Sequence, residues 1–161
     1  MQARLDRQQA MNDSRRALML DAARTVFEKL GIEGASIREI AKQAGYTPGA
    51  IYSYFENKEA IYGALLAESL ERLNAAVDAA GSPGLEPAEM LDAKASAWFG
   101  FFATNPRDLD LGFYLVQGMR PRGLTAELNY KLNDRLHDAL RPCEVALQAM
   151  GLSADDALRE N

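Results

Sequence analysis

Hydrophobic residues recur at spacings of three and four along most of this 161-residue chain, which predicts a series of amphipathic helices. A first helix is expected over residues 15–30, and Gly31 is suited to end it. Longer or more apolar helical segments are expected further on, over residues 58–80, 86–105, 108–118 and 125–150.

Breaks in the pattern mark the ends of these elements. Gly- and Pro-rich loops are predicted at residues 81–84 and 120–123. Pro142 predicts a kink or break in the last long helix, and a further helix is expected to start at residue 154. Residues 1–14 show no lasting apolar period, so we expect a mobile or partly helical arm there.

Residues 36–55 carry the densest local signals and predict two short helices joined by a tight turn. Ser36 followed by Glu39 forms a capping-box pattern at the start of the first. Gly45 stands where a left-handed residue would end it. Thr47 and Pro48 are suited to the first positions of the second helix, which we expect to run to residue 55.

A helix–turn–helix of this kind places its second helix in the major groove of DNA. Ile51 and Phe55 lie four residues apart and are expected to pack inward, which leaves an outer face of Gly49, Ala50, Tyr52, Ser53 and Tyr54 for phosphates and base edges. Lys58, at the start of the next helix, would suit a phosphate. The alternative is an ordinary helical hairpin whose tyrosines are half-buried packing residues. Residues 1–14 could likewise follow the DNA or form a solvated terminus.

The charge distribution supports DNA binding at one end of the chain only. The net charge is −5, which argues against a protein that coats nucleic acid. Residues 1–60 hold nine basic and eight acidic residues, a charge of +1, whereas the remainder holds nine and fifteen, a charge of −6.

The composition predicts a soluble, cytoplasmic protein without a catalytic centre. The single cysteine, Cys143, excludes an internal disulfide, and no run of residues is apolar enough to predict a membrane span or a signal peptide. His137 and Cys143 do not make a metal site, and no paired nucleophile and base or glycine-rich phosphate loop is present. We expect no enzyme, cofactor or metal.

Residues 86–150 are rich in aromatic side chains, which suggests a mostly apolar ligand pocket between helices. The alternative for each of these aromatic residues is plain core packing. The candidate pocket residues are Trp98, Phe102, Phe113, Tyr114 and Gln117.

Residues 15–66 closely resemble the N-terminal domain of the tetracycline-repressor (TetR) family of bacterial transcription regulators. The resemblance is carried by Phe27 and by four stretches of residue types with the right turn lengths between them: Gly31-Ile32-Glu33-Gly34, Ile37-Arg38-Glu39-Ile40-Ala41, Ala44-Gly45 and Tyr52-Ser53-Tyr54-Phe55-Glu56-Asn57-Lys58-Glu59.

The resemblance implies an all-α protein: a three-helix DNA-binding domain over residues 15–60, a linking helix over residues 58–80, and a helical regulatory and dimerisation domain over residues 81–161. Family members usually carry two more long helices that pack against a second subunit, so we expect either that the chain is truncated or that the dimer contact is made otherwise. The DNA-binding set that the resemblance implies includes Arg38, for which a solvated arginine is the alternative, together with Ser36, Thr47 and Pro48.

The function implied by the resemblance is a homodimeric repressor released from a palindromic double-stranded DNA operator by a small apolar or aromatic effector. One alternative is a DNA-binding architectural or recruiting protein without an inducer. Another is a small helical enzyme or interaction module whose hairpin never meets DNA.

Overall fold

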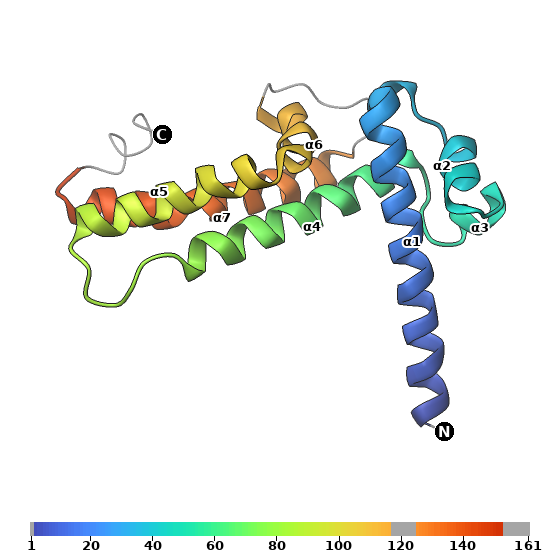
Figure 1. The fold of residues 1–161 in the computed structure, drawn as a ribbon, viewed down its shortest axis with the longest axis horizontal. Helices are drawn as coiled ribbons and strands as arrows, with labels where there is room; N and C mark the ends of the chain where they lie inside the picture. The colour runs from blue at the N-terminus through green and yellow to red at the C-terminus, as the bar shows by residue number, and fades with distance from the viewer. Residues whose placement is uncertain (1, 117–124, 153–161) are drawn as a thin grey trace. The chain divides into compact units, whose positions relative to one another are not determined.

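The computed structural model describes residues 2–116 and 125–152, and their regular structure is helical throughout (Figure 1). The predicted loop at residues 120–123, and the helix expected from residue 154, lie outside the described residues. The helices in chain order are α1 (Gln2–Gly34), α2 (Ile37–Ala44), α3 (Pro48–Tyr52), α4 (Lys58–Ala79), α5 (Pro87–Thr104), α6 (Pro106–Val116) and α7 (Ala126–Ala149).

The chain divides between residues 65 and 66 into two compact units, so α4 contributes residues to both. In the first unit α1 packs against α2, and α2 against α3. The rings of Phe27 and Tyr62 meet edge to face with their centroids 6.2 Å apart. Both side chains are buried together with Met19, Ile40 and Ile51, which confirms Phe27 as a core residue of this first unit, the helical head of the protein.

In the second unit α5 packs along α7, and α6 packs against α5. Its core takes apolar residues from α4, α5, α6 and α7, including Leu73, Val77, Phe101, Leu111 and Leu132. Asp108, whose side chain is only 5% exposed, is neutralised by Arg72 at 2.6 Å. A buried carboxylate needs such a partner because it has lost its hydration.

The structure differs from the expectations at two places. The predicted arm, described as mobile or partly helical, is helical from Gln2 onward as part of α1. Good helix formers and bonds between side chains four residues apart, such as Gln9 to Asp13 at 3.0 Å, sustain a helix without an apolar face. At Pro142, where a kink or break was expected, α7 continues without a break.

None of the described helices has the length and apolar character needed to cross a membrane. Over the same described ranges, no group of three or more metal-ligating side chains comes together.

Candidate nucleic-acid interface

Ser36 begins α2 as predicted, with its hydroxyl as the N-cap. The Oγ atom accepts a hydrogen bond from the Glu39 N–H at 3.3 Å, and its own proton goes to Glu39 Oε2 at 2.8 Å. The two residues of the capping-box pattern therefore do interact, but through a bond between their side chains. The hydroxyl of Ser36 is consequently occupied by the helix it caps.

Gly45 ends α2 in the left-handed conformation, with φ 72° and ψ 26°, as predicted. The N–H groups of Tyr46 and Gly45 donate to the carbonyls of Ala41 and Lys42 at 2.9 and 3.3 Å. These paired bonds satisfy carbonyls at the helix end and turn the chain sharply.

Thr47 then caps α3, its Oγ1 accepting from the Ala50 N–H at 3.2 Å, with Pro48 in the first turn. The angle between α2 and α3 is thus set by local bonds.

The short helix α3 has one buried and one exposed face. Ile51 is fully buried, whereas the side chain of Tyr52 is 58% exposed. Thr47, Pro48, Gly49 and Ser53 are also exposed, and Ala50 is half-buried. The predicted outer face is therefore accessible apart from Ala50 and Tyr54, which are half-buried.

The helix is shorter than predicted, because α3 ends at Tyr52 and the chain turns at Ser53 and Tyr54. Tyr54 is half-buried, and its hydroxyl lies 3.5 Å from Oδ1 of Asn12 on α1. Its neighbour Phe55 is buried, with the guanidinium of Arg16 5.3 Å from the ring centre. Tyr54 thus fits the alternative of a half-buried packing residue better than it fits a DNA contact.

The ammonium of Lys58, which was expected to contact a phosphate, binds groups of the protein itself. It donates to three backbone carbonyls at the end of α1, those of Ile32 at 2.7 Å, Glu33 at 3.2 Å and Ala35 at 3.1 Å. The side chain is therefore engaged within the protein.

Arg38 is exposed on α2, as its predicted role requires, and Lys42 is exposed four residues further along. Residues four apart share one face of a helix, so α2 presents two cations together. Lys42 was absent from the predicted set, although its spacing from Arg38 could have identified it.

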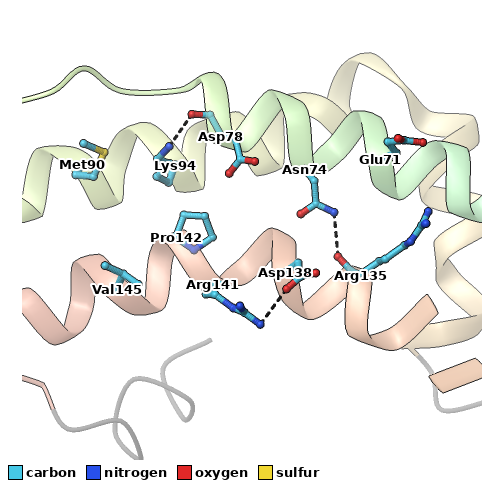
Figure 2. Close-up of a pocket in the computed structure, with 10 residues that line it drawn as sticks. All are labelled: Glu71, Asn74, Asp78, Met90, Lys94, Arg135, Asp138, Arg141, Pro142 and Val145. Carbon is cyan, nitrogen blue, oxygen red and sulfur yellow. Dashed lines mark hydrogen bonds and ion pairs between the residues drawn. The ribbon is translucent and has the colours of Figure 1, made fainter. Parts of the chain in front are cut away.

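The second unit contains a cavity of about 730 Å³. Figure 2 shows its lining residues, which come from α4, α5 and α7. The cavity is lined by Glu71, Asn74, Asp78, Met90, Lys94, Arg135, Asp138, Arg141, Pro142 and Val145.

This lining differs from the predicted aromatic pocket. Trp98 and Phe102 are not among the lining residues and instead pack edge to face, with ring centroids 4.9 Å apart. The side chains of Phe113 and Tyr114, and the whole of Gln117, lie outside the described residues. Trp98 and Phe102 are both half-buried, and a role for them in ligand binding stays a prediction.

Polar bonds hold the cavity walls. Asn74 of α4 donates to the carbonyl of Arg135 on α7 at 3.0 Å, and Lys94 of α5 donates to the Val77 and Asp78 carbonyls at 2.9 and 3.0 Å (Figure 2). An ion pair of 2.9 Å joins Arg141 to Asp138 along α7. The cavity is thus bordered by charges of both signs.

Comparison with known proteins agrees with this geometry. Residues 19–65 match the family described as bacterial regulatory proteins, tetR family. The chain is 25% identical over 150 residues to the uncharacterized HTH-type transcriptional regulator YhgD of Bacillus subtilis, a match covering 86% of this chain and 78% of that protein.

Two solved structures share the fold. A bacterial regulatory protein of the tetR family from Rhodococcus RHA1 superposes with a TM-score of 0.74 at 24% identity, covering 84% of this chain and 68% of that one. The transcriptional regulator FadR from Bacillus subtilis, solved in complex with stearoyl-CoA, superposes with a TM-score of 0.60 at 26% identity, covering 86% and 76%. These comparisons confirm the predicted all-α fold and the predicted resemblance to the TetR family of transcriptional regulators, which the family match carries over residues 19–65.

Proposed function

We propose that this protein is a repressor that binds a palindromic operator as a homodimer through α3, and that a small molecule bound in its helical body releases it. The observation that carries this proposal is the pair of faces on α3. Fully buried Ile51 anchors the helix, while its neighbour Tyr52 is 58% exposed.

The outer face of α3 suits close contact with a base edge. Gly49 has no side chain, so the start of the helix can approach the groove closely. The exposed hydroxyls of Thr47, Tyr52 and Ser53 can then reach phosphates or bases. Arg38 on α2 supplies positive charge beside them.

Two copies of the head would read two half-sites. In dimeric helix–turn–helix proteins the reading helices lie about one DNA turn apart, roughly 34–36 Å, so the operator mirrors the symmetry of the dimer. Repression follows when such an operator overlaps a promoter.

The cavity between α4, α5 and α7 supports a role for a small-molecule effector. Its volume of about 730 Å³ is ordinary for a ligand site. Met90, Pro142 and Val145 give it apolar surface beside charged groups, which suits an amphipathic molecule better than a purely aromatic one. The FadR neighbour, solved with stearoyl-CoA, is an example of such a ligand on this fold.

Release by the effector would be a population shift carried by α4. Lys58, at its start, belongs to the DNA-binding unit, and Glu71, Asn74 and Asp78 of the same helix line the cavity. A switch from 1:99 to 99:1 requires a ligand that prefers the non-binding state by about 5.5 kcal/mol.

The first test is selection of bound duplexes from a random DNA pool at near-physiological salt. A palindrome with half-sites about one turn apart supports the proposal, and failure to enrich any sequence overturns it. Recovery of a single half-site contradicts the dimer while leaving the reading helix in place.

The role of Tyr52 is tested with a matched pair of variants. Tyr52→Ala is expected to weaken binding to the selected duplex by about 5- to 150-fold for each half-site, the cost of one lost base contact of about 1–3 kcal/mol per subunit. Tyr130→Ala removes a tyrosine of α7 that is 71% exposed and is expected to leave affinity unchanged. Equal effects of the two substitutions would contradict the assignment of α3 as the reading helix.

The effector is tested with stearoyl-CoA as the probe. Binding in the cavity is expected to raise the melting temperature of the protein and to lower its affinity for the selected duplex. An increase in melting temperature with unchanged DNA affinity would mean that the probe binds without controlling the head.

A further inference from the structure

We infer that Lys58 is a positioning residue, which holds the reading helix in place by joining the two ends of the helix–turn–helix, and that its ammonium does not contact DNA. The effect of this on DNA binding rests on the proposed function of α3. The positioning itself is a property of the free protein and can be measured without DNA.

The first argument is the number of bonds. A lysine ammonium has three N–H donors and no acceptor. Nζ of Lys58 donates to the carbonyls of Ile32, Glu33 and Ala35 at 2.7, 3.2 and 3.1 Å. All three donors are therefore used, and the side chain is half-buried. A phosphate could take this ammonium only by displacing carbonyls from it.

The second argument is the electrostatics of the place where the ammonium lies. The last carbonyls of a helix lack partners within the helix and carry partial negative charge. Gly31, with φ 67° and ψ 168°, interrupts α1 one turn before its end. The carbonyls of the final turn and of Ala35 are thereby presented to one atom, and a compact positive charge is the group that satisfies them together.

The third argument is the position of Lys58 in the chain. Ala35 directly precedes Ser36, the N-cap of α2, and Lys58 is the first residue of α4. Asn57, just before it, caps α4 by accepting from the Ala60 N–H at 2.7 Å. Residues 36–57, which contain the whole of α2 and α3, thus have both ends fixed at a single ammonium.

Loss of the ammonium should free both ends of this segment. Three carbonyls would lose their donor, two of them on the buried residues Ile32 and Ala35. The helices α2 and α3 would then open more often, because local opening is easiest where few tertiary bonds hold a segment. The exposed groups that read DNA would be unchanged in identity but less well positioned.

Amide hydrogen exchange on the free full-length protein tests this directly. Lys58→Met keeps the apolar stem of the side chain and removes its charge. We expect amides of α2 to exchange at least fivefold faster than in the wild type, and those of α7 to be unchanged. Lys29→Met, at an exposed lysine of α1, is the matched control and should leave α2 within twofold of the wild type. A smaller than fivefold increase in Lys58→Met overturns the inference.

The conservative variant Lys58→Arg keeps the experiment decisive if Lys58→Met does not fold. A planar guanidinium spreads its donors over a fork and cannot direct three of them from one atom. We therefore expect α2 to exchange at least fivefold faster in this variant too, despite the retained charge. Wild-type exchange with arginine would show that positive charge alone is sufficient and would overturn the assignment.

The salt dependence of DNA binding separates positioning from phosphate contact. Each lost phosphate contact lowers the slope of log affinity against log salt by about 0.9 on duplex DNA. We expect Lys58→Met to lower affinity for the selected duplex at least fivefold with a slope within about 0.3 of the wild type. A slope reduced by about 0.9 for each bound subunit, hence about 1.8 for a dimer on a palindrome, would overturn the inference. If the wild type binds no duplex, the proposed function fails while the exchange experiment still decides the role of Lys58.

Discussion

Replacement of Gly45 by alanine isolates the energetic cost of the turn that orients the reading helix. Gly45 has φ 72° and ψ 26°, a left-handed conformation that L-residues with a Cβ adopt at a cost. A Cβ added there would meet no atom within 4 Å. The substitution therefore introduces backbone strain without any clash.

The magnitude follows from two opposing terms. The left-handed conformation costs alanine about 1–2 kcal/mol, and alanine regains about 0.4–1 kcal/mol because it restricts the unfolded chain. We expect Gly45→Ala to lower the free energy of unfolding by about 1 kcal/mol, with the N–H bonds of Gly45 and Tyr46 to the end of α2 preserved.

Urea unfolding followed by circular dichroism measures this difference, and the slope with urea should stay unchanged. Gly45→Asn is the control, because asparagine tolerates the left-handed region, and it should cost less than half as much. The reasoning is refuted if Gly45→Ala is as stable as the wild type. It is also refuted if both variants cost the same, since the loss would then come from the added side chain and not from the backbone.

Three further predictions concern other parts of the chain. Gly49→Ala should keep or raise stability by up to about 1 kcal/mol, because Gly49 is helical and its added Cβ would stand 3.9 Å from the side-chain oxygen of Thr47, an ordinary contact. Binding to the selected duplex, measured by fluorescence anisotropy, should weaken, and unchanged binding would show that this face does not approach DNA closely. Arg72→Met should lower the free energy of unfolding by about 1–3 kcal/mol, because it removes the cation paired with the buried Asp108. Arg141→Met, at an exposed ion pair, should lower it by less than about 1 kcal/mol. Equal losses for the two substitutions in urea unfolding would contradict this ranking. Burial raises the pKa of the Cys143 thiol, so at pH 8 the folded protein holds less thiolate than the unfolded chain does. Labelling of Cys143 by a thiol reagent should therefore be slower in the folded protein than in urea. Equal labelling rates would show that the thiol is accessible in the folded protein.

The head of the protein was largely predictable because its signals are local. The caps at Ser36 and Thr47 and the left-handed Gly45 each use atoms within a few residues of one another, so the residue types alone indicate the bonds. The burial of Ile51 followed from helical spacing in the same way. The length of α3 did not follow, because the chain after Tyr52 is directed by packing against α1, which lies far away in the sequence.

The sequence by itself determined that the protein is helical, where most helices begin and end, and which small domain is predicted to bind DNA, because helix periodicity and capping act within a turn or two. Only the tertiary structure decided which side chains remain available. Lys58 is engaged by carbonyls 23 to 26 residues away, and the cavity takes its lining from three separate helices rather than from the aromatic cluster. These outcomes depend on which atoms distant segments bring together, and no pattern along the chain encodes those distances.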